Sequence, residues 1–299
     1  LALDRLNRLV DADAGNHTIT VQAGMTLRDL YKEVNKIGLY FPPHPGDEGA
    51  FIGGAVAANA GGARAVKYGT VKRYVIGLQV VLADGRTVNL GGKFIKSSTG
   101  YQLMDLLIGS EGTLGVITRV TLALLPPPGS IQTLVIPFAS VEQAIGMVPG
   151  ILKADIIPCA VEFVEHNVMR CAERLLQRVW PARTGAASLM VILDGRNEED
   201  VLGQAEAVGA IAEQAGGLDV FLADSREKQA DILELRSMLY EALRPGTVEL
   251  FDICGPRSEI AAHVGFIRGL EQKHSVSLPT YGHAADGNVH THSLRRRLE

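Results

Sequence analysis

The sequence predicts an α+β protein of two domains, and the second domain has the element order of a ferredoxin-like fold. The chain has 299 residues, enough for two domains of ordinary size. Hydrophobic residues make up 46% of it and charged residues 21%, so it can bury a sizeable core. Residues 126–129 are three prolines and a glycine, which continue neither a helix nor a central strand. We therefore predict domains at residues 1–128 and 129–299.

The first domain alternates strand patterns with one clear helix. Thr26 and Asp29 resemble a capping box, and apolar residues then recur on one helical face until Gly38, a plausible stop. An Asp-Gly pair between two apolar runs predicts a hairpin. The predicted strands are, in order, 17–23, 74–83, 86–90 and 115–125.

The second domain shows the order βαββαβ, which is typical of a ferredoxin-like layout. Its predicted strands are 131–138, 157–164, 188–193 and 218–223. The helices expected between them are 140–154 and 198–214, with an extra helix near 165–177. Further helices are expected at 225–243 and 258–274, and a further strand near 248–254.

Composition excludes several classes of protein. A net charge of −4 argues against a nucleic-acid binder, which needs clustered Lys and Arg to neutralise phosphates. The chain has no apolar run long enough for a membrane-spanning helix. Three widely spaced cysteines suit neither a disulfide scaffold nor a CxxC zinc site. We expect a cytoplasmic protein, with peripheral membrane association left open, and a chain that is incomplete at both ends.

The common nucleotide-binding and hydrolase motifs are absent from this sequence. No two glycines are spaced G-x-G, so the Rossmann fingerprint is missing. There is also no Walker A motif, no GxSxG and no HExxH. Hydride transfer to a Rossmann-bound nicotinamide is therefore disfavoured.

Glycine is concentrated in the first domain, where 15 of the 33 glycines lie between Gly46 and Gly115. Residues 45–62 read PGDEGAFIGGAVAANAGG, and residues 109–118 read GSEGTLGVIT. Glycine at this density lets main-chain N–H groups approach an anion or a flat ring without a Cβ clash. The alternative is a small-residue helix packed closely on a sheet, and composition alone leaves both open.

Three of the eight histidines fall within residues 281–292, YGHAADGNVHTH. A turn signal at 286–288 could bring His283 and His290 together as ligands of a divalent metal. The alternative is a loop with hydrogen-bonding histidines. We interpret His292, which alternates onto the same strand face as His290, as a surface residue.

Together these three blocks resemble the vanillyl-alcohol oxidase type of FAD-linked oxidases, which carry a PCMH-type FAD-binding domain. Within it they resemble the 2-hydroxy-acid branch, which includes D-lactate dehydrogenase, the glycolate oxidase flavin subunit and D-2-hydroxyglutarate dehydrogenase. Residues 3–7, LDRLN, resemble the strand that precedes this region in the family. The resemblance implies part of an FAD-binding type-2 α+β domain, followed by a ferredoxin-like FAD-oxidase C-terminal domain. It also implies oxidation of a small D-2-hydroxy acid to the 2-oxo acid by hydride transfer to flavin.

The resemblance further implies a set of FAD-contacting residues. Those implied for the diphosphate and ring are Pro45, Gly46, Gly53, Gly54, Asn59, Gly61 and Gly62. Those implied for the ribityl–adenosine portion are Glu111, Gly112, Gly115 and Ile117. The family's first phosphate loop lies upstream of the residue that corresponds to Leu1.

The catalytic residues implied by the resemblance are His283, His290 and Arg236. The two histidines would bind a metal such as Zn²⁺ or Mn²⁺, with a further Glu ligand and a catalytic His in a later segment that this chain lacks. Arg236 would hold the substrate carboxylate, because a guanidinium fork forms two parallel bonds to it. From the sequence alone, Arg236 could equally lie on a solvated helix face.

Several alternatives stay open at this point. One is a metal-independent alcohol or lactone oxidase of the same fold, which the histidine pair disfavours. Another is a flavoprotein subunit without catalytic activity. The electron acceptor could be a quinone, a cytochrome, an electron-transferring flavoprotein or an iron–sulfur subunit, and a homodimer is also left open.

Overall fold

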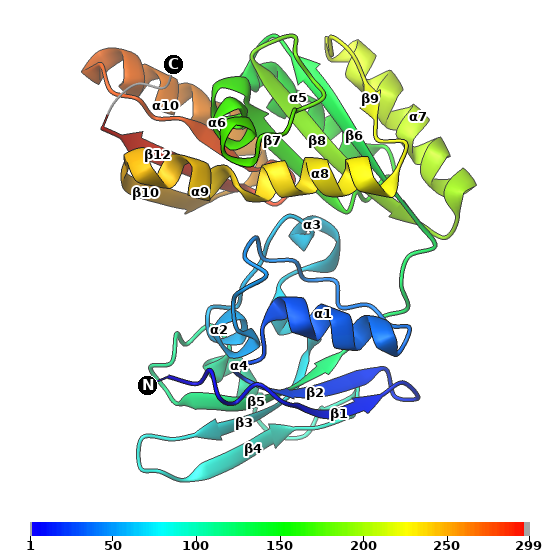
Figure 1. Cartoon of the computed structure of the whole chain (residues 1–299), viewed down its shortest axis with the longest axis vertical. Helices are drawn as coiled ribbons and strands as arrows, with labels where there is room; N and C mark the ends of the chain where they lie inside the picture. The colour runs from blue at the N-terminus through cyan, green and yellow to red at the C-terminus, as the bar shows by residue number, and fades with distance from the viewer. Residues whose placement is uncertain (1, 296–299) are drawn as a thin grey trace. The chain divides into compact units, whose positions relative to one another are not determined.

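The computed structural model describes residues 2–295, which form two units (Figure 1). One unit ends at Pro127 and the next begins at Pro128, one residue before the predicted boundary. Both units mix helices and strands, so the predicted α+β class is confirmed. Among the described residues, no helix combines the length and apolar character that a bilayer-spanning helix needs.

The first unit is built on an antiparallel sheet of five strands in the order β1-β2-β5-β3-β4. The strands are β1 (Leu9–Asp13), β2 (Thr18–Gln22), β3 (Val75–Val81), β4 (Thr87–Gly91) and β5 (Val116–Ala123). Four of them coincide with predicted strands. Strand β1 was not predicted. Its side chains are almost all exposed, so its sequence does not alternate between apolar and polar residues.

Helix α1 (Leu27–Lys36) begins as the sequence predicted. Thr26 Oγ1 accepts a hydrogen bond from the Asp29 main-chain N–H at 3.1 Å, and Gly38 follows the helix with φ +70°. The buried face of α1 joins the core beneath it, and Figure 1 shows α1 and α2 on one side of the sheet. The short helices are α2 (Ile52–Ala57), α3 (Ala65–Tyr68), the 3-10 helix η1 (Val71–Tyr74) and α4 (Met104–Leu107).

The second unit contains the predicted ferredoxin-like core. Its four strands are β6 (Ser130–Phe138), β7 (Ala160–Glu165), β8 (Ala187–Gly195) and β9 (Phe221–Leu222). They lie in the antiparallel order β7-β8-β6-β9, which is the strand order of that fold read from its second strand to its fourth.

The same sheet continues past β7 through three further strands, in the order β11, β12 and β10. These are β10 (Thr247–Cys254), β11 (Thr280–His283) and β12 (Asn288–Leu294). The C-terminal histidine block is therefore the β11–β12 hairpin, and β12 is an interior strand between β10 and β11. The sequence did not indicate that these strands would join the ferredoxin-like sheet.

The helices of the second unit form two groups. The first group is α5 (Val141–Lys153), α7 (Glu198–Gln214) and α10 (Ile260–His274), in which α5 packs against the other two. The second group is α6 (His166–Leu176), α8 (Arg226–Ser237) and α9 (Leu239–Leu243), in which α6 packs against the other two. The predicted helix 225–243 is thus interrupted, at Met238. The 3-10 helices are η2 (Arg244–Gly246) and η3 (Arg257–Glu259).

Strand β7 presents buried acidic side chains to both helix groups. Glu162 pairs with Arg236 of α8, whereas Glu165 pairs with Arg268 of α10. Residues three apart on a strand point to opposite faces, which explains the two directions. A buried carboxylate needs a charged partner, so each pair ties a helix to the sheet.

Candidate functional site

The two glycine-rich blocks lie side by side in the first unit. The Gly109 N–H donates to the Val56 carbonyl at 3.1 Å, and the Glu111 N–H donates to the Ala57 carbonyl at 2.8 Å. Two segments some fifty residues apart are thereby joined at the end of α2. We use the name glycine-rich surface for residues 45–46, 53–62 and 109–112.

Three of the predicted cofactor glycines are required by internal packing. A Cβ on Gly53 would lie 2.6 Å from the Cβ of Ala23, and one on Gly115 would lie 2.6 Å from Cγ1 of Val80. A Cβ on Gly62 would lie 2.1 Å from a main-chain oxygen of the loop before α2. For these positions, close packing of small residues is a sufficient explanation.

The remaining predicted glycines face open space. A Cβ on Gly46, Gly54 or Gly112 would meet no heavy atom within 4 Å, and one on Gly61 would make only an ordinary contact at 3.7 Å. Internal packing therefore does not explain why these positions lack a side chain, although φ +76° at Gly112 favours glycine there for the backbone alone. Bare backbone over open space is what a flat ring or a diphosphate requires, so these residues fit an FAD.

Two other predicted residues have left-handed backbone. Asn59 has φ 48° and Glu111 has φ 51°. Asn tolerates this region, but Glu is disfavoured there, and such strain is concentrated at functional sites. Pro45 is half-buried at the start of the glycine-rich surface. Ile117 is 5% exposed in the core, so only its main chain is available for a cofactor.

A buried charge cluster lies in the second unit, where β7, β11 and α8 meet. Glu162 is fully buried and pairs in register with His283 across β7 and β11. Its Oε2 accepts from Arg236 Nε at 2.7 Å and also contacts Nη2, and its Oε1 lies 2.6 Å from His283 Nδ1. Arg236 is 9% exposed, so the alternative that it lies on a solvated helix face is wrong. We use the name Glu162 cluster for Glu162, Arg236 and His283.

The charge of Glu162 fixes the roles of its neighbours. Burial alone would raise the pKa of this carboxyl, but the charges and hydrogen bonds of Arg236 and His283 outweigh burial and hold the pKa at about 2. A carboxylate only accepts, so His283 Nδ1 must carry the hydrogen. Arg236 Nη2 lies 3.4 Å from the same Nδ1, but both atoms are then donors, and this approach is a contact without a bond.

The structure brings His283 and His290 together, as the turn between them predicted. Their ring centroids are 5.3 Å apart and the rings are nearly perpendicular. Asp252 of β10 pairs in register with His290, and its Oδ1 lies 3.4 Å from His290 Nδ1. The His290 hydrogen bond is the main reason why the pKa of Asp252 is lowered.

Each of these histidines therefore directs Nδ1 at a carboxylate. Among residues 2–295, no hydrogen-bond partner is found for Nε2 of His283 or of His290. A metal-binding imidazole has this arrangement, because the carboxylate orients the ring and makes the second nitrogen a better ligand. The pair fits two ligands of a divalent ion. No group of three or more suitable side chains occurs among the described residues, so a complete shell needs further donors.

His292 is not a surface residue, and that expectation was wrong. It is fully buried, with Nδ1 2.8 Å from Thr247 Oγ1 and Nε2 3.2 Å from the Tyr281 hydroxyl. Burial lowers the pKa of His292 to about 4, so the ring is neutral at ordinary pH. The prediction failed because the ring packs against Thr247, Tyr281 and Tyr240 of α9, contacts that the sequence of β12 does not reveal.

Sequence reasoning missed three residues of this region. Glu162 and Asp252 anchor the two histidines, and the Tyr281 ring lies 5.2 Å from the Arg236 guanidinium carbon. Burial raises the pKa of Tyr281 to about 12, so it stays a phenol. A signal for Glu162 was present, because β7 reads AVEFVE and a charge inside a buried strand calls for a partner.

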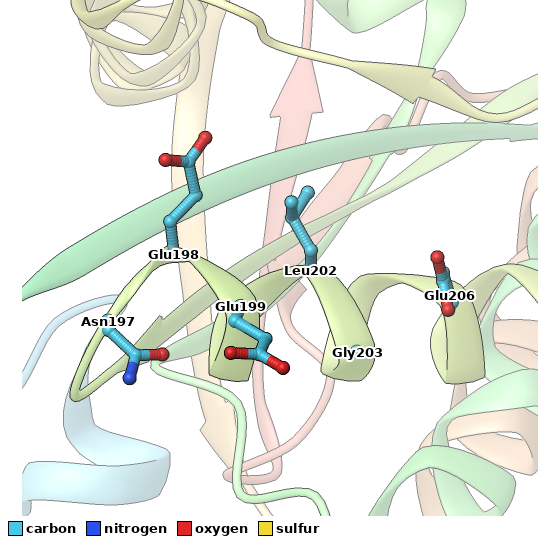
Figure 2. Close-up of a pocket in the computed structure, with 6 residues that line it drawn as sticks. All are labelled: Asn197, Glu198, Glu199, Leu202, Gly203 and Glu206. Atoms are coloured by element: carbon cyan, nitrogen blue, oxygen red, sulfur yellow. The ribbon is translucent and has the colours of Figure 1, made fainter.

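A shallow hollow on the surface of α7 contains none of the predicted residues. Figure 2 shows its lining, which includes three carboxylates and no cationic side chain. A negative lining repels both a diphosphate and a carboxylate substrate. The lining residues are Asn197, Glu198, Glu199, Leu202, Gly203 and Glu206.

Comparison with known families agrees with both units. Residues 127–297 match the family described as FAD linked oxidases, C-terminal domain, and residues 1–91 match the FAD binding domain family. The first match covers more than half of the chain. The chain therefore belongs to the FAD-linked oxidases, as the resemblance implied.

Two individual proteins are similar to this chain over nearly its whole length. The chain is 41% identical to a D-lactate dehydrogenase of Archaeoglobus fulgidus, over 98% of this chain and 65% of that protein. It is 36% identical to the glycolate oxidase subunit GlcD of Bacillus subtilis, over 97% of this chain and 62% of that protein. The chain thus spans less than two thirds of the length of these relatives.

The solved structures support the same fold. A 4-ethylphenol oxidase from Gulosibacter chungangensis superposes with a TM-score of 0.73 at 15% identity, over 97% of this chain and 64% of that one. At this identity the likeness concerns the fold alone.

Proposed function

We propose that the whole protein binds FAD and oxidises a small D-2-hydroxy acid to the 2-oxo acid. The observation that carries this proposal is the Glu162 cluster together with His290. It places a guanidinium and two carboxylate-anchored imidazoles within contact distance of one another. The guanidinium of Arg236 can bind a carboxylate, and the two imidazoles beside it each have a free Nε2. This arrangement suits a substrate in which a carboxylate lies next to a hydroxyl. The named activities of the relatives, lactate and glycolate oxidation, belong to the same class.

The glycine-rich surface is the proposed FAD site. Its open glycines would lie against the diphosphate and ring, and the strained backbone at Glu111 would follow the ribityl–adenosine portion. When bound, the flavin supplies a hydride acceptor, which no side chain of this protein provides. We propose that reoxidation uses a separate acceptor, such as a quinone, a cytochrome or another redox protein.

Arg236 is the proposed anchor for the substrate carboxylate. Its Nε and Nη2 face Glu162, whereas Nη1 has no hydrogen-bond partner among the described residues. The Nη1–Nη2 edge is therefore the one that can bind a carboxylate with two parallel bonds. The Tyr281 ring lies against the guanidinium and restricts its rotation.

His283 and His290 are the proposed ligands of a divalent ion, Zn²⁺ or Mn²⁺. Such an ion, when bound, would supply a positive charge that lowers the pKa of the substrate hydroxyl. The protein's part is to orient both rings through their Nδ1 atoms, so that Nε2 is the nitrogen each neutral ring presents to the ion, and the carboxylates of Glu162 and Asp252 serve this purpose.

The cofactor site is tested by Gly54→Val in the full-length protein. The branched side chain would occupy the open space over α2, so we expect FAD occupancy to fall several-fold while the unfolding temperature changes little. Gly203→Val is the matched control, because Gly203 is also helical, exposed and without neighbours within 4 Å. Equal FAD content in both variants and the parent would place the cofactor elsewhere.

The reaction is tested by turnover of the purified full-length protein with an artificial electron acceptor. D-lactate, glycolate and D-2-hydroxyglutarate are compared with neutral alcohols of similar size. We expect at least one hydroxy acid to be oxidised much faster than any neutral alcohol. Preference for the neutral alcohols would instead indicate an alcohol oxidase of the same fold.

A further inference from the structure

We propose that Glu162 is a positioning residue that sets both the tautomer of His283 and the free edge of Arg236. This inference rests on the proposed function and deepens it. One carboxylate would thus prepare the metal-binding end and the carboxylate-binding end of the site together. Glu162 itself would touch neither substrate nor cofactor.

The two carboxylate oxygens of Glu162 contact different residues. Oε2 faces the Nε side of Arg236, and Oε1 faces His283 Nδ1. The side chain is fully buried, so water does not replace either partner. Neither contact can be lost without leaving a buried polar group unsatisfied, which fixes the geometry of all three residues.

The pairing with Arg236 determines which edge of the guanidinium is exposed to a ligand. Because the Nε side is held by Glu162, the substrate is offered Nη1 and the outer hydrogen of Nη2. The pair also cancels its own charge, so Arg236 contributes direction and hydrogen bonds more than net positive charge. The net positive charge that draws a carboxylate would then come from the ion at His283 and His290.

The pairing with His283 determines which ring nitrogen is a ligand. A carboxylate accepts hydrogen bonds and donates none, so Nδ1 carries a hydrogen, and in the neutral ring Nε2 is the nitrogen with the free lone pair. An amide in place of the carboxylate reverses this. Since Arg236 only donates, the oxygen of a Gln must face Arg236, and its NH₂ group must then face His283 Nδ1. Nδ1 becomes the acceptor, and the hydrogen moves to Nε2.

Glu162→Gln in the full-length protein tests this directly. The first readout is the ¹⁵N NMR spectrum of ring-labelled histidine in metal-free protein, which distinguishes a protonated nitrogen from an unprotonated one. We expect the parent to have its hydrogen on Nδ1 of His283 and the variant to have it on Nε2. The second readout is turnover, for which we expect about a 10- to 100-fold loss of kcat together with weaker metal retention.

Glu165→Gln is the matched control. Glu165 lies on the same strand, is 6% exposed, and also pairs with an arginine, but among residues 2–295 no histidine ring hydrogen-bonds to its carboxylate. Loss of the Glu165 carboxylate should lower the free energy of unfolding without altering the His283 tautomer, and kcat should change less than about threefold. A purely structural role of Glu162 predicts that the two variants behave alike, and that result would overturn the proposal.

The parent protein alone also tests the proposal, should Glu162→Gln not fold. A metal-free parent with the hydrogen on Nε2 of His283 would contradict it. The tautomer is measured without substrate, so it separates this inference from the proposed reaction. An Nδ1 tautomer in a protein that oxidises no hydroxy acid would support the role of Glu162 and contradict the reaction.

Discussion

Removal of the divalent ion should abolish hydroxy-acid oxidation by the full-length protein while leaving FAD bound. The ion would sit on Nε2 of His283 and of His290 in the second unit, whereas the glycine-rich surface belongs to the first. Treatment with EDTA should therefore remove about one ion per flavin, with activity lost in parallel and restored by Zn²⁺ or Mn²⁺. The measurement is elemental analysis alongside activity before and after chelation.

His290→Ala should reproduce the effect of chelation. It removes one imidazole ligand, and two or three remaining donors hold a divalent ion poorly. His274→Ala is a suitable control, because that side chain is exposed at the end of α10. A metal-free enzyme with undiminished turnover would eliminate the metal role and favour the metal-independent oxidase.

Arg236→Lys should weaken hydroxy-acid oxidation and spare the neutral alcohol. Lys keeps a positive charge beside buried Glu162 but loses the planar fork that binds a carboxylate through two bonds. A charge-assisted hydrogen bond contributes roughly 1.5–3 kcal/mol, which corresponds to about a 10- to 150-fold loss of kcat/KM. The measurement compares kcat/KM for a 2-hydroxy acid and for the corresponding alcohol without the carboxylate.

The choice of Lys is dictated by the burial of Arg236. An apolar replacement would leave Glu162 as an unpaired buried charge and destabilise the fold by about 3–5 kcal/mol. Loss of activity in such a variant would say nothing about the substrate. If Arg236→Lys lowers both rates equally, Arg236 supports the fold without recognising a carboxylate.

Local patterns in the sequence predicted most of the second unit. The strands of the ferredoxin-like core are rich in apolar residues, with the glutamates of β7 as the exception, and caps such as Ser140 and Asn197 mark the helix starts. The turn at Gly287 placed His283 and His290 on facing strands. These features depend on neighbours along the chain, which is why they could be predicted.

Contacts between distant segments could not be predicted in the same way. Glu162 and His283 are 121 residues apart and meet only because β11 pairs with β7. His292 is buried because its ring packs against Tyr281, Thr247 and Tyr240, and the last two lie more than forty residues away along the chain. The position of a strand within a sheet depends on packing of the whole unit, and the strand's own residues do not specify it.

The glycines likewise combine one feature that the sequence predicted with one that it could not predict. The density of glycine between Gly46 and Gly115 predicted a surface of bare backbone but did not separate its two causes. Only the structure shows that Gly53 and Gly115 serve internal packing, whereas Gly54 and Gly112 face open space. A variant series for cofactor binding should therefore use Gly54, because Gly112 has φ +76°, where any side chain would strain the backbone.

The most direct test of the proposed reaction is anaerobic mixing of the full-length, FAD-loaded protein with a candidate substrate, followed by its visible spectrum. Hydride transfer from a hydroxy acid bleaches the bands of oxidised flavin without any external acceptor. The account predicts stoichiometric bleaching by D-lactate, glycolate or D-2-hydroxyglutarate, and much slower bleaching by the corresponding neutral alcohol. Flavin bands that persist with all three hydroxy acids and bleach with a neutral alcohol would contradict it.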